Sequence, residues 1–308
     1  MIELTIMIEG QNGLNWQRWQ RIVPLVEDLG FAGLFRSDHF TNGKPPDLDS
    51  LELWVSLTWL AGHTRRIEFG PLVSPVSFRH PAFTARVASA VDDLSGGRLR
   101  LGLGAGWQDR EHHNFGFELL DLPERFVRFQ EGLEVITRLL RSDNPIFFEG
   151  KYFKLYDALL LPRPIRPGGP PIIIGGNGAN RTLPLAARYA DEWNAVFATS
   201  ANFRRLSQRL DLLLEKNNRQ TASVRRSLMT NLTFGRNDQE LQARLHGRSK
   251  PEMCARGLLV GTPGEITDQL GELASAGVQR VMLQWLDLDD LDGLEAFAST
   301  VLPQFKGS

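Results

Sequence analysis

The sequence predicts an α/β fold, a (β/α)8 TIM barrel with surface insertions, and three observations support this. Short apolar runs alternate with amphipathic helical stretches along most of the chain, and no hairpin signal joins consecutive runs. Strands that alternate with helices are parallel, and each is followed by a crossover helix. A length of 308 residues suits one such barrel. A doubly wound open sheet is the alternative, because the sequence does not show whether the sheet closes.

The first half of the chain supplies four units of strand followed by helix. Gly30 ends the first helix and Pro81 begins the third, which are positions that these residue types favour. The predicted strands cover residues 3–9, 31–35, 67–73 and 98–104, and the predicted helices cover residues 16–30, 51–61, 81–94 and 124–141.

The second half repeats the alternation with two interruptions. Residues 144–170 contain short extended segments and a run of prolines, and we expect an insertion on the barrel surface because no helix pattern occurs there. Residues 236–259 are charged and irregular, which predicts a mobile loop or lid. The whole chain, residues 1–308, is thus predicted to be a single barrel domain. The remaining strands are predicted at residues 171–174, 193–197, 228–234 and 278–285, and the remaining helices at 181–189, 202–217, 262–276 and 291–305.

Composition excludes several classes of partner. The chain has 35 basic and 36 acidic residues, a balance that argues against nucleic acid or an anionic membrane surface. It has no apolar run long enough to span a membrane and no signal-peptide pattern at its start, so we expect a cytoplasmic protein that acts on a small molecule. The single cysteine, Cys254, excludes an internal disulfide and is expected to be ordinary packing, although a catalytic thiol stays open.

Three loops that follow predicted strands carry the candidate site. In a TIM barrel the ligand lies at the carboxyl ends of the strands, so Asp38 and His39, residues 104–111 and residues 175–178 would share one rim. The glycine-rich run at 104–106 would let a ligand lie against bare backbone, and the glycines at 175–178 could point N–H groups at a phosphate. Each motif also has a purely structural interpretation as a turn or a helix cap.

Several reaction types lack the residues that they need. The first strand carries no H-x-H pair or carboxylate cluster, and adjacent His112 and His113 are poorly spaced for one ion, so no metal site is predicted. All lysines fall outside the predicted strands, which argues against Schiff-base chemistry, and no G-x-S-x-G elbow is present. A glycine-rich, apolar pocket with few donors suits a cofactor that carries the chemistry itself.

Motifs spread over about two thirds of the chain resemble one family. They are FAGLFRSDH at 31–39, FGPLVSPVSFRHP at 69–81, DLSGGRLRLGLGAGW at 93–107, EHHNFG at 111–116, ERF at 124–126, and IIIGGNG with YADEWN within 172–194. In this order and spacing they resemble the bacterial luciferase-like monooxygenase superfamily, particularly its F420-dependent oxidoreductases. The resemblance implies a barrel that binds coenzyme F420 or FMN and forms a homo-oligomer, most simply a dimer.

The resemblance also implies roles for individual residues. Leu72 and Val73 match a strand bulge with a non-prolyl cis peptide that supports the cofactor ring. Where some F420-dependent dehydrogenases carry a glutamate acid this chain has Trp107, so that role is unfilled or moves to Glu111, and sugar-phosphate dehydrogenase activity is disfavoured. The implied catalytic residues are His39 and Glu111, and the implied cofactor-binding residues are Asp38, Leu72, Val73, Gly104, Ala105, Gly106, Gly175, Gly176, Asn177 and Gly178.

The leading hypothesis is an F420-dependent oxidoreductase that moves a hydride between the deazaflavin C5 and a small organic substrate. His39, assisted by Glu111, would handle the proton, while burial and the neighbouring Asp38 would shift its charge state in opposite directions. An FMN-dependent monooxygenase that uses reduced flavin and O2 is the alternative, with residues 236–259 as a lid in either case. A lesser alternative is a non-catalytic protein that binds flavin or deazaflavin. We expect the insertion and the lid to form the pocket walls.

Overall fold

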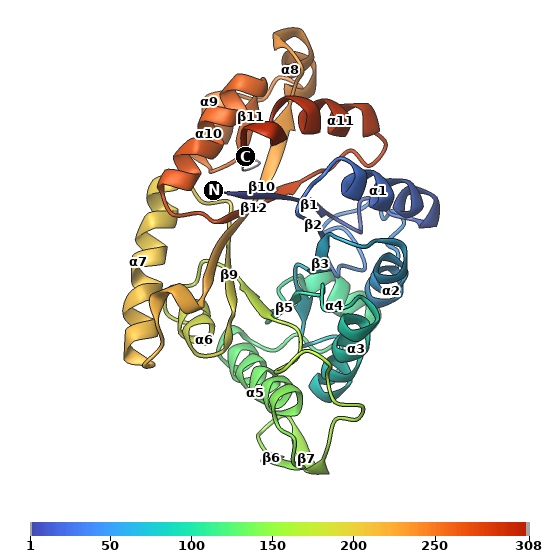
Figure 1. Ribbon diagram of the computed structural model, residues 1–308, viewed down its shortest axis with the longest axis vertical. Coiled ribbons are helices and arrows are strands. Elements are labelled where there is room, and N and C mark those ends of the chain that lie inside the picture. Colours follow the sequence, from blue (N-terminus) through green and yellow to red (C-terminus); the bar gives the residue numbers. More distant parts are fainter. Residues whose placement is uncertain (1, 306–308) are drawn as a thin grey trace.

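In the computed structural model, which describes residues 2–305, ten strands form one parallel sheet ringed by helices (Figure 1). The strand order is β3-β2-β1-β12-β10-β9-β8-β5-β4, with β11 paired beside β10. Because β3 and β4 are two halves of one broken strand and β11 lies outside the ring, the ten strands fill eight barrel positions. The strands are β1 (Glu3–Ile8), β2 (Gly33–Arg36), β3 (Glu68–Pro71), β4 (Ser74–Pro75), β5 (Leu101–Gly104), β8 (Ile172–Gly175), β9 (Glu192–Val196), β10 (Arg225–Phe234), β11 (Leu259–Gly261) and β12 (Arg280–Gln284).

The sheet closes between β3 and the residues at the start of β5. The Arg100 N–H donates to the Phe69 carbonyl at 2.8 Å, and the Phe69 N–H donates to the Arg98 carbonyl at 3.2 Å. At this seam Gly70 and Gly102 leave no room for a side chain, because a Cβ on Gly102 would overlap the facing carbonyl oxygen of β3. The predicted barrel is therefore confirmed, and the open-sheet alternative is wrong.

Helices cover the outside of the barrel, as amphipathic crossovers should. In the first helix Trp19 and Val23 face the sheet and are fully buried, and the Asn15 side chain caps the helix by accepting the Arg18 N–H at 3.1 Å. None of the helices within residues 2–305 combines the length and the apolar character needed to cross a membrane. The helices are α1 (Trp16–Asp28), α2 (Leu53–His63), α3 (Pro81–Leu94), α4 (Asp109–Phe115), α5 (Leu122–Arg141), α6 (Thr182–Tyr189), α7 (Ser200–Lys216), α8 (Asp238–Leu245), α9 (Lys250–Ala255), α10 (Pro263–Ser275) and α11 (Leu291–Thr300), with short 3-10 turns at Thr221–Ser223 and Leu302–Phe305.

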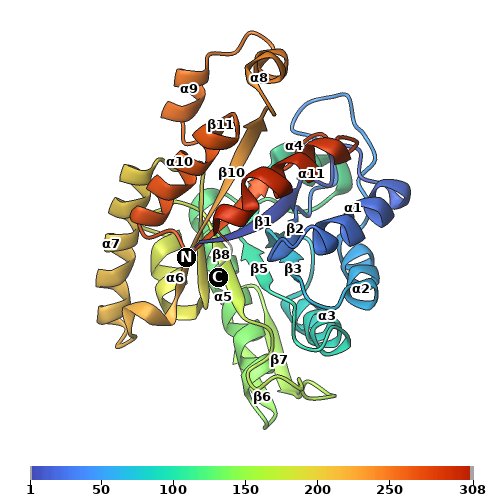
Figure 2. The same ribbon diagram turned by 45° about the horizontal axis from the view of Figure 1, so that its top comes forward.

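Two segments interrupt the predicted alternation of strands and helices, residues 144–170 and 236–259, and the structure agrees with only one of the two predictions. Residues 144–170 contain an antiparallel hairpin, β6 (Ile146–Glu149) with β7 (Lys154–Ala158), which projects beside α5 (Figure 2). Residues 236–259, which we expected to be irregular, instead form α8, α9 and the start of β11. That expectation was wrong because the apolar face of Leu241, Leu245 and Met253 packs on Val260 and forms a small core of its own.

The interior of the barrel is filled in layers. Near the amino ends of the strands, the Arg280 guanidinium lies among three carboxylates, donating to Glu192 at 3.0 Å, to Glu3 at 2.8 Å and to Glu68. Burial would lower the pKa of Arg280, but the three carboxylates outweigh this and raise it, so the guanidinium stays charged. The next layer is apolar and consists of Met7, Phe35, Leu72, Ile173, Met229 and Met282.

The seam predicts that Gly102→Ala lowers the free energy of unfolding by about 3 kcal/mol, since its Cβ meets backbone that cannot move aside. Urea unfolding would measure this. Gly271→Ala in α10 is the matched control, because beyond its chain neighbours and its own helix backbone no atom lies within 4 Å of the added Cβ. Equal unfolding midpoints for the two variants would show that the seam is not tight.

Candidate active site

The carboxyl ends of the strands surround a cavity of about 470 Å3. Each of the eight barrel positions contributes at least one lining residue, either from the strand or from the loop that follows it. Met7, Leu72 and Met229 belong both to the apolar layer and to the cavity lining, so they form the floor. A ligand here would rest on an apolar surface with polar groups only around its edge.

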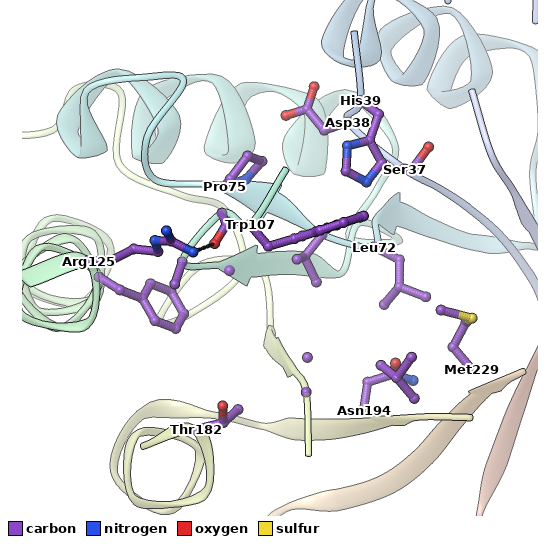
Figure 3. Close-up of a pocket in the computed structure, with 18 of the residues that line it drawn as sticks. Ser37, Asp38, His39, Leu72, Pro75, Trp107, Arg125, Thr182, Asn194 and Met229 are labelled. Atoms are coloured by element: carbon purple, nitrogen blue, oxygen red, sulfur yellow. Dashed lines mark hydrogen bonds between the residues drawn. The ribbon is translucent and has the colours of Figure 1, made fainter. Parts of the chain in front are cut away.

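His39 and Glu111 form a hydrogen-bonded pair in the wall of the cavity. The loop after β2 brings His39 to the rim, and the first turn of α4 brings Glu111, which is only 1% exposed. His39 Nδ1 lies 2.8 Å from Glu111 Oε1, and the Phe40 backbone N–H donates to Glu111 Oε2 at 2.9 Å. Because Nδ1 faces the carboxylate, Nε2 is the ring nitrogen that is left to meet a ligand (Figure 3).

The environment of His39 favours the protonated imidazole. Burial on its own would lower the pKa of His39, but the hydrogen bond and the charge of Glu111 outweigh it, with smaller effects from Glu9 and Asp38, and raise the pKa above its ordinary value. The charge of Asp38 acts against burial as we expected, but Glu111 has the larger effect on the pKa of His39.

The Asp38 carboxylate is engaged on the side away from His39. It forms an ion pair with Arg79 and accepts the Ser74 hydroxyl at 2.8 Å. Burial raises the pKa of Asp38, and the charge of Arg79 only partly offsets that effect. Figure 3 shows the carboxylate and the His39 imidazole pointing in different directions. Asp38 lines the cavity as predicted, but its carboxylate mainly holds the loop after β2 in place.

Bare backbone forms two other walls of the cavity. The Leu72–Val73 peptide bond is cis, as the resemblance implies, and it lies where β3 changes to β4. Gly104, Ala105 and Gly106 line the cavity beside it, and Gly106 has a φ of +82°, a conformation that glycine adopts easily. Gly175 and Gly176, at the end of the neighbouring strand β8, also line the cavity. These surfaces can contact a flat ring closely.

Asn177 and Gly178 were predicted to contact the cofactor, but neither lines the cavity. The Asn177 side chain instead bridges to β9, donating to the Val196 carbonyl at 2.6 Å and accepting its N–H at 2.9 Å. The Gly176 N–H donates to the Asn194 carbonyl at 2.9 Å and is not free for a phosphate. The Gly176 N–H and the Asn177 side chain are therefore held by β9, and the phosphate contact predicted for Asn177 and Gly178 stays a prediction.

Arg125 is a functional candidate that the sequence did not single out, although it lies within the ERF motif. It comes from the first turn of α5 and donates to the carbonyls of Gly106 at 3.2 Å and Leu120 at 2.9 Å. Within residues 2–305 it has no ion pair with a carboxylate, so its charge is available to a ligand. Its placement depends on where α5 begins relative to the rim, which motif spacing does not reveal.

The cavity walls also differ from our expectation, since no residue of 144–170 or 236–259 lines them. The strand ends, α4, α5 and α6 supply them instead. Lining residues that we did not predict are Met7, Glu9, Ser37, Pro75, Trp107, Leu122, Arg125, Phe126, Phe129, Thr182, Asn194, Val196, Phe197, Met229 and Gln284.

Two other candidates lie elsewhere. The part of the chain between residues 2 and 305 holds no cluster of three histidine, cysteine or carboxylate side chains that could bind a metal. Cys254 is half-buried in α9, away from the cavity, and burial raises the pKa of its thiol, which makes it a poorer nucleophile.

The fold and the site together define a barrel enzyme of the cofactor-dependent kind, with an apolar cavity floor and a hydrogen-bonded histidine–glutamate pair at the strand ends. A model of the family described as luciferase-like monooxygenase matches residues 4–250. The chain therefore belongs to that family and is an oxidoreductase of the luciferase-like type.

Relatives of two kinds are similar to the chain. A 4-hydroxyprotoasukamycin monooxygenase of Streptomyces nodosus subsp. asukaensis is 28% identical, over 96% of this chain and 88% of the relative. An F420-dependent glucose-6-phosphate dehydrogenase of Intrasporangium calvum is 26% identical, over 92% of each. An F420-dependent secondary alcohol dehydrogenase, solved with an F420-acetone adduct, has the same fold with a TM-score of 0.87, 18% identity and 99% coverage of both chains.

The pair predicts that Glu111→Gln lowers the pKa of His39, because the hydrogen bond and charge that most strongly oppose the effect of burial are then removed. NMR titration of the histidine ring protons would measure this, with His39→Asn identifying the signal. Asp109→Asn on the same helix is the matched control and should leave the pKa of His39 unchanged.

The same shift has a consequence for stability. Because the folded pKa of His39 is raised, the contribution of the pair to the free energy of unfolding is fully present below the unfolded pKa. That contribution is lost as the pH rises through the folded pKa. A pKa of His39 that stays raised in Glu111→Gln would contradict the assigned cause.

Proposed function

We propose that this protein is an F420-dependent oxidoreductase that moves a hydride between the deazaflavin C5 and a small organic substrate. The observation that carries the proposal is the His39–Glu111 pair, a hydrogen-bonded titratable pair in the wall of a cavity whose floor is apolar and whose other walls include bare backbone. A reaction that needs one proton and one hydride can be served by such a site when a cofactor supplies the hydride.

The residues of the cavity fit a flat cofactor with a phosphate on its side chain. The backbone of Leu72 and Val73 and the glycines of 104–106 offer two close surfaces for a ring. Arg125, at the start of α5, is suited to hold the phosphate, since guanidinium groups bind phosphate oxygens in a bidentate manner. When bound, F420 supplies hydride transfer at C5, and these residues bind and orient it.

His39 is suited to handle the proton. Its Nδ1 is held by Glu111, which fixes the orientation of the ring, and its raised pKa keeps Nε2 protonated at a pH where an ordinary histidine is mostly neutral. In the reducing direction Nε2 would donate to the substrate oxygen, and in the oxidising direction the neutral ring would accept that proton. Glu111 acts through His39 and is a positioning residue in this scheme.

An FMN-dependent monooxygenase is the second candidate, supported by the curated monooxygenase among the relatives. The exposure of the cavity favours the F420 proposal, because oxygen chemistry on reduced flavin needs a site that excludes water. Trp107 at the mouth is 66% exposed, and the segment that we expected to act as a lid does not reach the cavity. The His39–Glu111 pair argues against a non-catalytic carrier, which has no need of a proton donor. The homo-oligomer that the resemblance implies stays a prediction.

A fluorescence titration with F420 and, separately, with FMN tests the proposal. We expect F420 to bind more tightly than FMN, and His39→Ala to bind F420 as the parent does while its turnover falls about a hundredfold, because only the proton transfer is removed. The reverse cofactor preference would support the monooxygenase, and unchanged turnover in His39→Ala would remove the assigned role.

The role of Arg125 predicts a loss that depends on the phosphate. Arg125→Leu should weaken F420 binding by about 2 kcal/mol, the value of a charge-assisted hydrogen bond, and should leave binding of the deazaflavin riboside, which lacks the phosphate, unchanged. Arg138→Leu on the same helix is the matched control, since Arg138 pairs with Glu134 outside the cavity. If Arg125→Leu weakened the binding of F420 and of the deazaflavin riboside equally, Arg125 would not be the residue that holds the phosphate.

A further inference from the structure

The mouth of the cavity exposes large apolar side chains. Trp107 is 66% exposed, Leu122 is 47% exposed and Phe197 is 41% exposed, and all three line the cavity. They come from three separate elements: the loop after β5, the start of α5 and the end of β9. Apolar side chains of this size that stay open to solvent around a cavity indicate a surface for an apolar ligand.

The carboxylates that line the cavity are already hydrogen-bonded. Asp38 pairs with Arg79, and Glu111 pairs with His39. Glu9 accepts hydrogen bonds from the side chains of Gln11, at 2.8 Å, and Gln284. Within the described residues, Glu9 is thus the one lining carboxylate without a counter-charge, and a cationic substrate would have to displace the two amide donors that already hold it.

The cations of the lining are equally committed. Arg125 is the group that we assign to the cofactor phosphate, and His39 is assigned to the reacting oxygen. Within residues 2–305 the lining contains no lysine and no second arginine. An anionic group on the substrate would thus lose its hydration without gaining a counter-charge, which is unfavourable in an apolar cavity.

Trp107 lies beside the group that handles the proton. Its ring centroid is 5.5 Å from that of His39, and the two planes meet at 85°. Figure 3 shows the indole edge-on, between His39 and Leu72 in this view. Because Trp107 is 66% exposed, much of the indole stays open beside the imidazole, and a planar ligand stacked there would have its polar atom within reach of His39.

We propose that the substrate is a neutral, flat, cyclic ketone that stacks on Trp107 and points its carbonyl oxygen at His39. This inference rests on the proposed function. In the reaction the carbonyl carbon accepts a hydride from C5 of the reduced deazaflavin, so one C–H bond breaks and another forms. The carbonyl π bond breaks, and its oxygen takes the proton from His39 Nε2. The ketone is reduced to an alcohol, the deazaflavin is oxidised, and His39 regains a proton from water.

The experiment compares three ketones with reduced F420 as the donor and follows the appearance of oxidised F420. Tetralone has a large flat face, cyclohexenone has a small one, and a carboxylate-substituted tetralone has the same face with a charge. We expect kcat/KM to be about tenfold or more higher for tetralone than for its carboxylate. Trp107→Ala should raise KM for tetralone about tenfold, change KM for cyclohexenone much less and leave kcat similar, because the lost stacking scales with the ring face.

Two variants serve as controls. Trp107→Phe keeps an aromatic face and should retain most of the affinity for tetralone. Tyr156→Ala removes an aromatic side chain of the same 66% exposure from the β6–β7 hairpin, outside the cavity, and should change nothing. Calorimetric binding of tetralone to protein loaded with oxidised F420 gives a readout that does not depend on turnover, and Trp107→Ala should weaken that binding about tenfold.

The outcomes separate the two proposals. Failure of the parent protein to bind F420 would overturn the proposed function and this inference with it. If the parent binds F420 but has the same kcat/KM for tetralone and its carboxylate, the proposed substrate class is wrong and the proposed function is unaffected. The same conclusion follows if Trp107→Ala leaves KM for both neutral ketones unchanged.

Discussion

The close approach of β3 and β5 is the constraint on which the rest of the structure depends. The two backbones meet through Gly70 and Gly102, and any side chain at these positions would overlap the facing carbonyl oxygen. This contact closes the sheet, and beyond it the third barrel strand breaks at Leu72 and Val73 before resuming as β4. The break turns backbone into the cavity. The feature that closes the barrel therefore also builds one wall of the site.

At the opposite end of the barrel, near the amino ends of the strands, charged side chains fill the interior. A closed barrel of eight strands encloses an interior that side chains must fill. Along the barrel axis these side chains change from charged to apolar. Arg280 neutralises carboxylates from three strands near their amino ends, and the layer above it contains Met7, Phe35 and Met282. The ionic cluster around Arg280 lies away from the cavity, and the cavity floor is apolar. The hydrogen-bonded pair His39 and Glu111 lies at the rim of the cavity instead.

The sequence predicted the fold well because its signals are local. Alternating apolar runs, Gly30 after the first helix and Pro81 before the third all act within a few residues, and the elements that they mark are present. Closure could not be predicted, because it depends on contacts between residues such as Phe69 and Leu99 that no periodicity links. The segment 236–259 was misjudged for a related reason, since its apolar side chains are sparse and gain a partner only when α8 and α9 fold onto Val260.

The site was predictable to the extent that it follows strand ends. His39, the glycines of 104–106 and Gly175 all lie where the rule for barrels places them. The roles within that set were less accessible, because they depend on which neighbour each side chain meets. Asp38 and His39 are adjacent in sequence, yet their side chains contact different partners. Asp38 pairs with Arg79, whereas His39 is hydrogen-bonded to Glu111. Arg125 and Trp107 gain importance only from the direction in which α5 and the loop after β5 approach the rim. The strand ends and the loops that follow them thus supply most of the cavity lining, while a few side chains from α4, α5 and α6 complete it.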